Sequence, residues 1–236
     1  MKAILSLLQF TTVLPLGKSQ DLGHFARHSY LFPFAGYMIG ALVALPVSLI
    51  ANQTIAAAVA VGLLFLITGA HHFDGLLDFG DGLMAHGDRE KRIRALTDRN
   101  VGAGAIAFAI STTILLFAGL QEASSIIFAI IIGEVCAKYS MSFLTAYGKP
   151  FHEGMHSYLH QFAHPDFPVL SFMLCLPLFF LPVAPIKIFG AMILMLLCPM
   201  VLLETSRQLF GGVNGDVVGA SNEITRALVI VAIALL

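Results

Sequence analysis

The sequence has 236 residues, of which 58% are hydrophobic and only 11% are charged, and its formal net charge is −1. A soluble domain has about 25% charged residues, so this composition excludes an ordinary soluble globular protein. The near-neutral charge also argues against a nucleic-acid partner, because nucleic-acid-binding domains carry a basic surface. The composition instead indicates a membrane protein in contact with lipid. The sequence is compatible with both a monomer and a homo-oligomer.

Seven apolar runs, most of them close to the length of a membrane span, follow one another along the chain. The N-terminal segment 1–17 has no small-residue cleavage site, so we expect an interfacial helix there rather than a signal peptide. The last run is the shortest, which predicts a truncated or tilted helix. The pattern predicts an all-α fold, a polytopic bundle of about seven transmembrane helices in one membrane domain, 1–236. The seven runs lie at about 31–51, 55–71, 101–120, 125–146, 168–184, 186–203 and 225–236.

The connections between these runs differ in length and charge, and the long ones lie on one side of the predicted bundle. That side carries eleven of the 13 Lys and Arg residues if Arg226, at the start of the last run, is included. Lys187 alone lies opposite, and Lys138 lies within a run. By the positive-inside rule we expect a multi-pass protein of the cell (inner) membrane whose N-terminus and long loops are cytoplasmic. These loops are 72–100, 147–167 and 204–224.

The residues with the clearest chemistry lie where the second apolar run reaches the 72–100 loop. Asp74, Asp78 and Asp81 are spaced i, i+4 and i+7, so in a helix their carboxylates project from one face. Three like charges so close together require a cation. Oxygen ligands suit a hard ion such as Mg²⁺, whose coordination is usually completed by substrate phosphates. We expect these three residues to bind Mg²⁺ and to be catalytic.

Two other interpretations of this stretch stay open. The aspartates would be solvated residues that end a span, although carboxylates at membrane depth are costly and usually functional. Alternatively, His71, His72 and Asp74 would bind zinc, although adjacent histidines point to different faces of a helix. Three aspartates in register favour the magnesium site.

Two more loops on the same side contain residues that we expect to contact substrate. Asp98 and Asn100 precede glycines at the start of a span, where backbone amides and a helix N-terminus favour an anion. The 147–167 loop contains Glu153 and four histidines at helical spacing, which either bind a metal or are simply solvated. We expect this loop to face substrate without being catalytic.

The stretch Gly211–Ala220 is too rich in glycine for a stable helix interior. We therefore expect it to be a loop. It is either an ordinary turn or a segment that presents Asn214 and Asp216 to a metal or to a ribose.

Sequence motifs occur in one characteristic order over most of the chain. They are Leu14-Pro15-Leu16, Phe32-Pro33, His72-x-Asp74-Gly75-Leu76-x-Asp78-x-x-Asp81-Gly82, an Arg-rich helix leading to Asp98-x-x-x-Gly102, Glu153-Gly154-Met155 with Ser157, and Gly211-Gly212-x-x-Gly215-Asp216-x-x-Gly219-Ala220. Together they resemble the cobalamin-5′-phosphate synthase family, whose activity is that of adenosylcobinamide-GDP ribazoletransferase. Two segments depart from the family pattern: Asp98-Arg99-Asn100 stands for Asp-Ser-Arg, and Glu153-Gly154-Met155-His156-Ser157 stands for Glu-Gly-Leu-Gly-Ser.

The resemblance implies a Mg²⁺-dependent transferase of the phosphotransferase type. It would join α-ribazole, or α-ribazole 5′-phosphate, to adenosylcobinamide-GDP and release GMP, giving adenosylcobalamin or its 5′-phosphate. Asp74, Asp78 and Asp81 would hold the Mg²⁺, and one of them would also accept a proton from the attacking hydroxyl. We expect the substrate-binding residues to be His72, Asp98, Asn100, Glu153, Asn214 and Asp216.

Two alternatives compete with this function. The CDP-alcohol phosphotransferases also place spaced aspartates on membrane helices, but their DGxxAR motif is absent here, because Asp74-Gly75 is followed by Leu-Leu-Asp. A cation or metabolite transporter would use carboxylates inside the membrane. Glu134 and Lys138, one turn apart within a span, would serve it, or they would form a local i, i+4 ion pair.

Overall fold

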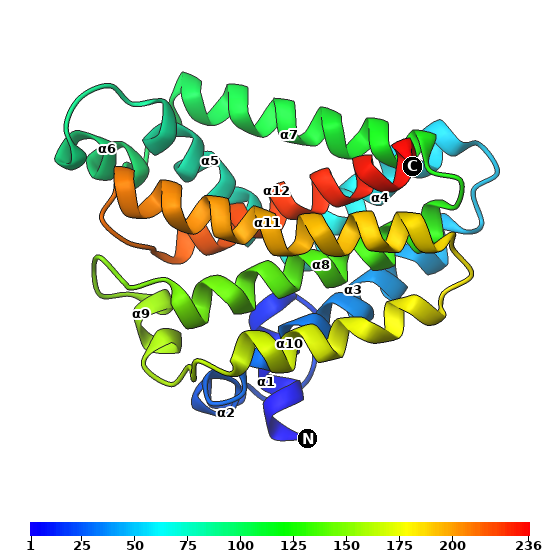
Figure 1. The fold of residues 1–236 in the computed structure, drawn as a ribbon, viewed down its shortest axis with the longest axis horizontal. Coiled ribbons are helices and arrows are strands. Elements are labelled where there is room, and N and C mark those ends of the chain that lie inside the picture. The colour runs from blue at the N-terminus through cyan, green and yellow to red at the C-terminus, as the bar shows by residue number, and fades with distance from the viewer.

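The computed structural model describes residues 1–236 and consists of helices joined by loops (Figure 1). No β-strand forms, and the one isolated β-bridge pairs Pro150 with Val213. The expected all-α fold is confirmed. The elements are α1 (Lys2–Thr11), α2 (Gly23–Ala26), η1 (Ser29–Leu31), α3 (Phe32–Val47), α4 (Gln53–Thr68), α5 (His71–Met84), α6 (Arg89–Leu96), α7 (Ala103–Glu122), α8 (Ile126–Tyr147), α9 (Met155–His160), α10 (Phe167–Cys175), η2 (Leu176–Phe180), α11 (Pro185–Leu209) and α12 (Gly215–Leu235).

Five helical segments are long and apolar enough to cross a membrane: η1 with α3, and the helices α7, α8, α11 and α12. The pair α4 and α5 meets the same criteria when taken together, but it is bent by 97°. A shorter apolar segment, Phe167–Phe180, comprises α10 and η2. These segments account for the seven apolar runs in order, so the chain is a polytopic membrane protein.

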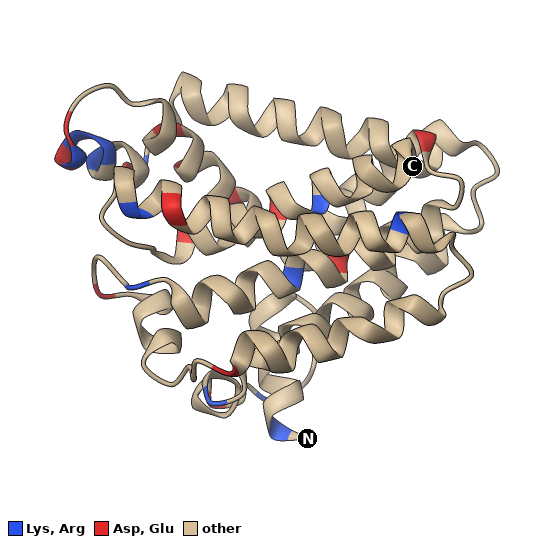
Figure 2. Ribbon diagram, in the orientation of Figure 1, with Lys and Arg blue, Asp and Glu red and all other residues tan.

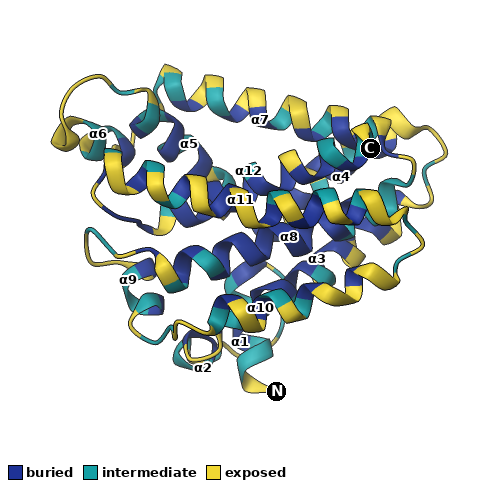
Figure 3. Ribbon diagram, in the orientation of Figure 1, coloured by how far each residue is buried: buried dark blue, intermediate teal, exposed yellow.

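The outward faces of the long helices are apolar. On α7, Ile106, Ile110 and Ile114 recur every four residues and are 50%, 53% and 60% exposed. Figure 3 shows exposed residues along the outer sides of α7, α10 and α11, while the sides that face the bundle are buried. In water such surfaces would be interaction sites, whereas here they match the hydrocarbon of a bilayer.

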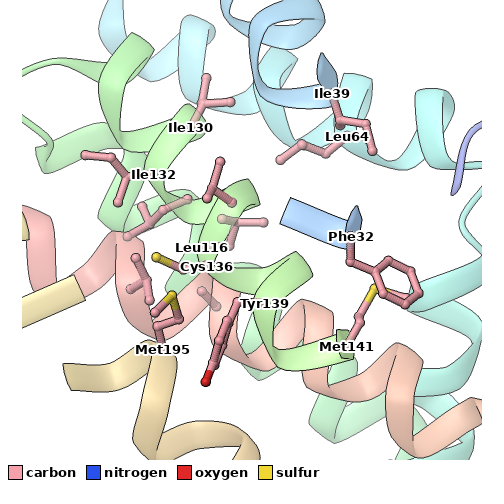
Figure 4. Packing of buried hydrophobic residues seen from close by; sticks show 14 of the residues in the cluster. Phe32, Ile39, Leu64, Leu116, Ile130, Ile132, Cys136, Tyr139, Met141 and Met195 are labelled. Atoms are coloured by element: carbon pink, nitrogen blue, oxygen red, sulfur yellow. The ribbon is translucent and has the colours of Figure 1, made fainter. Parts of the chain in front are cut away.

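The helix α8 lies at the centre of the bundle. It packs against α3, α10, α11 and α12, and 72% of its span is buried. Apolar side chains of α8, among them Ile130, Ile132 and Cys136, pack with residues of the surrounding helices (Figure 4). This cluster holds α3 and α12 in place on either side of α8.

The bend between α4 and α5 sets the direction of the helix that carries the three aspartates. It is made by two consecutive residues in the left-handed conformation, Gly69 with φ +63° and Ala70 with φ +56°. Glycine adopts this conformation without strain, whereas alanine does so rarely. The chain therefore leaves α4 abruptly, and α5 packs against α7 and α12.

The helix α12 is longer than the apolar pattern predicts, because it begins at Gly215 rather than near residue 225. The 204–224 segment, expected to be a loop, is helical except for residues 210–214, so that prediction was wrong. Asn214 caps the new helix start by accepting a backbone N–H with its side chain. Gly219 packs against the backbone of α5, and this close packing offsets the low helix propensity of glycine.

A cluster of four charged side chains lies in the core of the bundle between α8 and α12 and is visible as coloured segments in the middle of Figure 2. Glu134 and Lys138 form the predicted i, i+4 ion pair, with 3.8 Å between Oε2 and Nζ. Arg226 donates to Glu134 through Nε and to Glu223 through Nη1, the latter at 2.6 Å. Asn222 accepts a hydrogen bond of 2.7 Å from Lys138 Nζ. The two negative and two positive charges of the cluster therefore neutralise one another within the core.

The position of Arg226 corrects one part of the topology prediction. Counted above with the cytoplasmic loops, it is only 1% exposed and lies in the middle of α12. None of the other ten Lys and Arg residues assigned to the long-loop side is buried. Figure 2 shows most of the charged ribbon at the end of the molecule where α6 and α9 lie.

We expect Arg226→Met to lower the free energy of unfolding by about 3 to 5 kcal/mol, because it leaves an uncompensated negative charge in the core. The double variant Glu223→Met/Arg226→Met restores neutrality and should recover part of this loss. Thermal unfolding of the purified protein in detergent measures both effects. The exposed pair of Arg94 and Glu90, 4.0 Å apart, gives the control: Arg94→Met should change stability by less than about 1 kcal/mol. Equal losses for Arg94→Met and Arg226→Met would contradict a stabilising role of the cluster.

Candidate functional site

The helix α5 carries the three predicted aspartates and is held between α12, α7 and α6. Its buried face is formed by His72, Leu76, Phe79 and three glycines. Asp74 on the opposite side is exposed, while Asp78 and Asp81 are half-buried. The helical spacing predicted from the sequence is therefore present.

The crossing of α5 and α12 brings Asp216 to the same place. A Cβ atom at Gly75 would lie 2.7 Å from the backbone oxygen of Asp216, so only glycine allows this approach. Asp78 consequently experiences repulsion from Asp216 as well as from Asp74 and Asp81. Asn214 donates to one oxygen of the Asp216 carboxylate at 2.6 Å. Four carboxylates from two helices thus share one region, which we call the aspartate cluster.

No positively charged side chain pairs with the aspartate cluster. The six ion pairs of the structure all involve other carboxylates. This contrasts with the core, where every acid has a basic partner. Uncompensated acids that are partly buried attract a cation.

Asp81 differs from the other members because both of its oxygens are engaged. Oδ2 accepts the N–H of Gly102 at 2.6 Å, and Oδ1 accepts the N–H of Ala105 at 2.8 Å. These amides belong to the start of α7, so Asp81 caps that helix from a neighbouring one. Asp74 and Asp78 accept no such hydrogen bond and keep their oxygens free.

The metal prediction stays a prediction. No three His, Cys, Asp or Glu side chains lie close enough together to form a ready-made metal site. Mg²⁺ needs only one or two protein carboxylates, with water and substrate phosphates completing its octahedron. The free oxygens of Asp74 and Asp78 supply such a donor set. His71 is exposed while His72 is buried, so the adjacent histidines point in different directions. This arrangement disfavours the zinc alternative.

A second group of predicted residues lines a polar cavity of about 380 Å³ on the α7 side of the cluster. Asp98 and Asn100 lie there with Asp81. Asn100 donates to Oδ1 of Asp98 from its backbone at 3.0 Å and from its side chain at 2.9 Å. These bonds hold the pKa of Asp98 below its usual value. The structure therefore brings Asp98 and Asn100 together with Asp81.

The 147–167 segment meets the start of α12 through backbone contacts. Val213 donates its N–H to the carbonyl of Lys149 at 2.9 Å, beside the bridge to Pro150. The charge of His152 is close enough to act on Asp216. Glu153 is exposed, and its carboxylate has no partner in the protein. Of the predicted substrate contacts, Glu153 is the one whose carboxylate forms no bond with the rest of the site.

His72 lines another cavity, of about 390 Å³, which adjoins the cluster at Asp216. We call it the histidine cavity. It is bordered by His71, His72, Thr145, His156 and Asp216. Thr145 and His156 are absent from the predicted site residues. The sequence gives no signal for Thr145, which lies inside an apolar helix, whereas His156 falls within the Glu153–Ser157 motif and stood out only as one of four histidines.

A comparison of the whole sequence with known protein families gives one result. The family model described as cobalamin-5-phosphate synthase matches residues 3–234. The chain belongs to the cobalamin-5-phosphate synthase family. It is therefore a transferase of cobalamin biosynthesis, and the match extends over every helix of the bundle, including α5 and α12.

Curated relatives in this family are similar over nearly their full length. An adenosylcobinamide-GDP ribazoletransferase of Methanococcoides burtonii is 33% identical, over 95% of this chain and 88% of the relative. One of Methanocella arvoryzae is 35% identical, over 93% and 90%. One of Archaeoglobus fulgidus is 34% identical, over 92% and 90%. No solved structure matches the chain.

We expect Asp81→Ala to lower the free energy of unfolding by about 1 to 3 kcal/mol, because the amides of Gly102 and Ala105 lose a charged acceptor. Asp74→Ala is the matched control. It removes an exposed carboxylate without hydrogen bonds and reduces repulsion in the cluster, so stability should stay equal or rise. Thermal unfolding in detergent compares the two. If Asp81→Ala were as stable as Asp74→Ala, the capping role of Asp81 would be wrong.

Proposed function

We propose that this cobalamin-5-phosphate synthase family member joins α-ribazole, or α-ribazole 5′-phosphate, to adenosylcobinamide-GDP and releases GMP. The relatives named above support these substrates. The observation that carries the proposal is the aspartate cluster, four carboxylates without a basic partner. Such a cluster is suited to bind a divalent cation together with a diphosphate.

The reaction is a phosphoryl-group substitution. A ribose hydroxyl oxygen forms a bond to the phosphorus that is attached to the corrinoid, and the bond from this phosphorus to the oxygen of GMP breaks. The hydroxyl proton passes to a carboxylate. When bound, Mg²⁺ neutralises charge on the diphosphate and on the departing GMP.

The residues of the cluster have different parts in this proposal. Asp74 and Asp78 have free oxygens and serve as metal ligands, and one of them accepts the proton. Asp81, whose oxygens accept the N–H groups of two backbone amides, fixes the start of α7 beside the site. Asp216 borders both the cluster and the histidine cavity, so it is placed to contact the ribose.

The polar residues around the cluster provide substrate contacts. Asp98 and Asn100 line the polar cavity beside Asp81, and we assign them to adenosylcobinamide-GDP. Glu153 extends from the exposed loop, and Asn214 orients Asp216 through its hydrogen bond. We place this end of the bundle in the cytosol, because ten Lys and Arg residues lie on its side of the sequence pattern.

The test is an assay of the full chain in detergent or nanodiscs with adenosylcobinamide-GDP and α-ribazole. GMP release and the joined corrinoid product are followed by mass spectrometry. We expect product only with Mg²⁺, its loss on addition of EDTA, and a fall in kcat/KM of at least about 100-fold in Asp74→Asn and Asp78→Asn.

Asp88→Asn gives the matched control for this assay. Asp88 caps α6 by accepting the N–H of Lys91 at 3.0 Å, and asparagine preserves that cap, so activity should be retained. Full activity of folded Asp78→Asn protein would refute the catalytic role of the cluster. Folded wild-type protein without product would refute the transferase proposal.

A further inference from the structure

Three residues that line the histidine cavity each carry a buried side-chain polar atom without a hydrogen-bond partner in the protein. These atoms are Nδ1 of His72, Oγ1 of Thr145 and Nδ1 of His156. The residues are 6%, 0% and 3% exposed. A buried polar group without a hydrogen bond costs about 1 to 3 kcal/mol, and three such groups around one cavity favour a ligand that supplies the missing partners.

The hydrogen bond of His156 determines what its free nitrogen can do. Nε2 lies 2.8 Å from the carbonyl oxygen of Gly148, which can only accept, so Nε2 carries the proton. Burial lowers the pKa of His156 to about 4, and the ring is therefore neutral at physiological pH. Nδ1 then has a lone pair and can accept a hydrogen bond.

Apolar side chains form another part of the wall. They are those of Phe10, Phe32, Met141, Met155, Leu159 and Val218. Gln9, His71 and Asp216 add polar groups. A wall that combines phenylalanines with a few polar groups suits a flat aromatic ring system that carries a hydroxylated group.

The polar cavity, like the histidine cavity, lacks Lys and Arg, but it differs from the histidine cavity because no aromatic side chain lines it. It is lined by Asp81, Asp98 and Asn100 and opens beside the start of α7. The reaction requires two substrates of different chemistry, a diphosphate-linked corrinoid and a nucleoside with an apolar base. The two cavities adjoin different members of the aspartate cluster, Asp81 and Asp216, and only the histidine cavity offers aromatic side chains to a base.

We propose that the histidine cavity binds the nucleoside acceptor, with its fused aromatic base between the apolar side chains and its ribose directed to Asp216. His156 Nδ1 accepts a hydrogen bond from a ribose hydroxyl, and the Thr145 hydroxyl donates to a ring nitrogen of the base. Asp216 lies both on the cavity wall and in the aspartate cluster, so the ribose reaches the reacting atoms. The assignment rests on the proposed transferase function.

The test measures binding of α-ribazole alone, by equilibrium dialysis of the full chain in detergent, together with the KM for each substrate. Thr145→Val and His156→Phe keep the side-chain shape and remove one polar contact each. We expect Kd and KM for α-ribazole to rise about 3- to 10-fold in each, while the KM for adenosylcobinamide-GDP stays unchanged.

Thr225→Val is the matched control. Thr225 is fully buried, and its Oγ1 also lacks a partner, but it lies in α12 outside the cavity. This variant should bind α-ribazole like the wild type. Thermal unfolding should show no large loss of stability in either threonine variant, because neither hydroxyl has a hydrogen-bond partner in the protein.

The outcomes separate the two proposals. If the wild type forms product but Thr145→Val, His156→Phe and Thr225→Val share one Kd for α-ribazole, the cavity holds only water and its assignment is wrong. If the wild type binds α-ribazole, with the expected losses in the first two variants, but forms no product, the cavity assignment stands and the transfer chemistry is wrong. If the wild type neither binds α-ribazole nor forms product, both are wrong.

Discussion

The burial of charge in an apolar surrounding is the constraint on which this bundle depends. Glu134, Lys138, Glu223 and Arg226 join α8 to α12 in the core, where an unpaired charge would be very costly. Their pairing fixes how α12 slides and rotates against α8. Asp216 lies seven residues before Glu223 on the same helix, about 10 Å along its axis. The register that neutralises the core therefore also positions a carboxylate at the edge of the site.

The same chain thus treats its acids in two ways. In the core each acid has a basic partner, and the network is internally neutral. At the crossing of α5 and α12, four aspartates have no basic partner, and only Asp81 has both oxygens occupied by backbone amides. The difference separates a cluster that holds helices together from a cluster suited to an external cation. It also argues against reading Glu134 and Lys138 as the ion site of a transporter, because their charges are already compensated.

Local patterns in the sequence predicted the features that depend on local spacing. The seven apolar runs, the helical spacing of the three aspartates and the Glu134–Lys138 pair all arise within a few turns of one segment, and the structure contains each of them. The features that were missed depend on contacts between distant segments. Gly219 is helical because α5 packs on it, Arg226 is buried because Glu134 lies opposite, and Thr145 borders a cavity formed by several helices. The role of Asp81 as a cap for α7 could not be read from the i, i+7 spacing for the same reason.

The bend at Gly69 and Ala70 has a consequence for the electrical environment of the aspartates. The turn of 97° lays α5 against α7 and α12 instead of continuing α4. Asp81 then lies at the start of α7, and Gly75 lies against Asp216 in the first turn of α12. The start of each helix carries a partial positive charge. The carboxylates therefore lie in the positive potential of two helix dipoles, which lowers their mutual repulsion without any basic side chain.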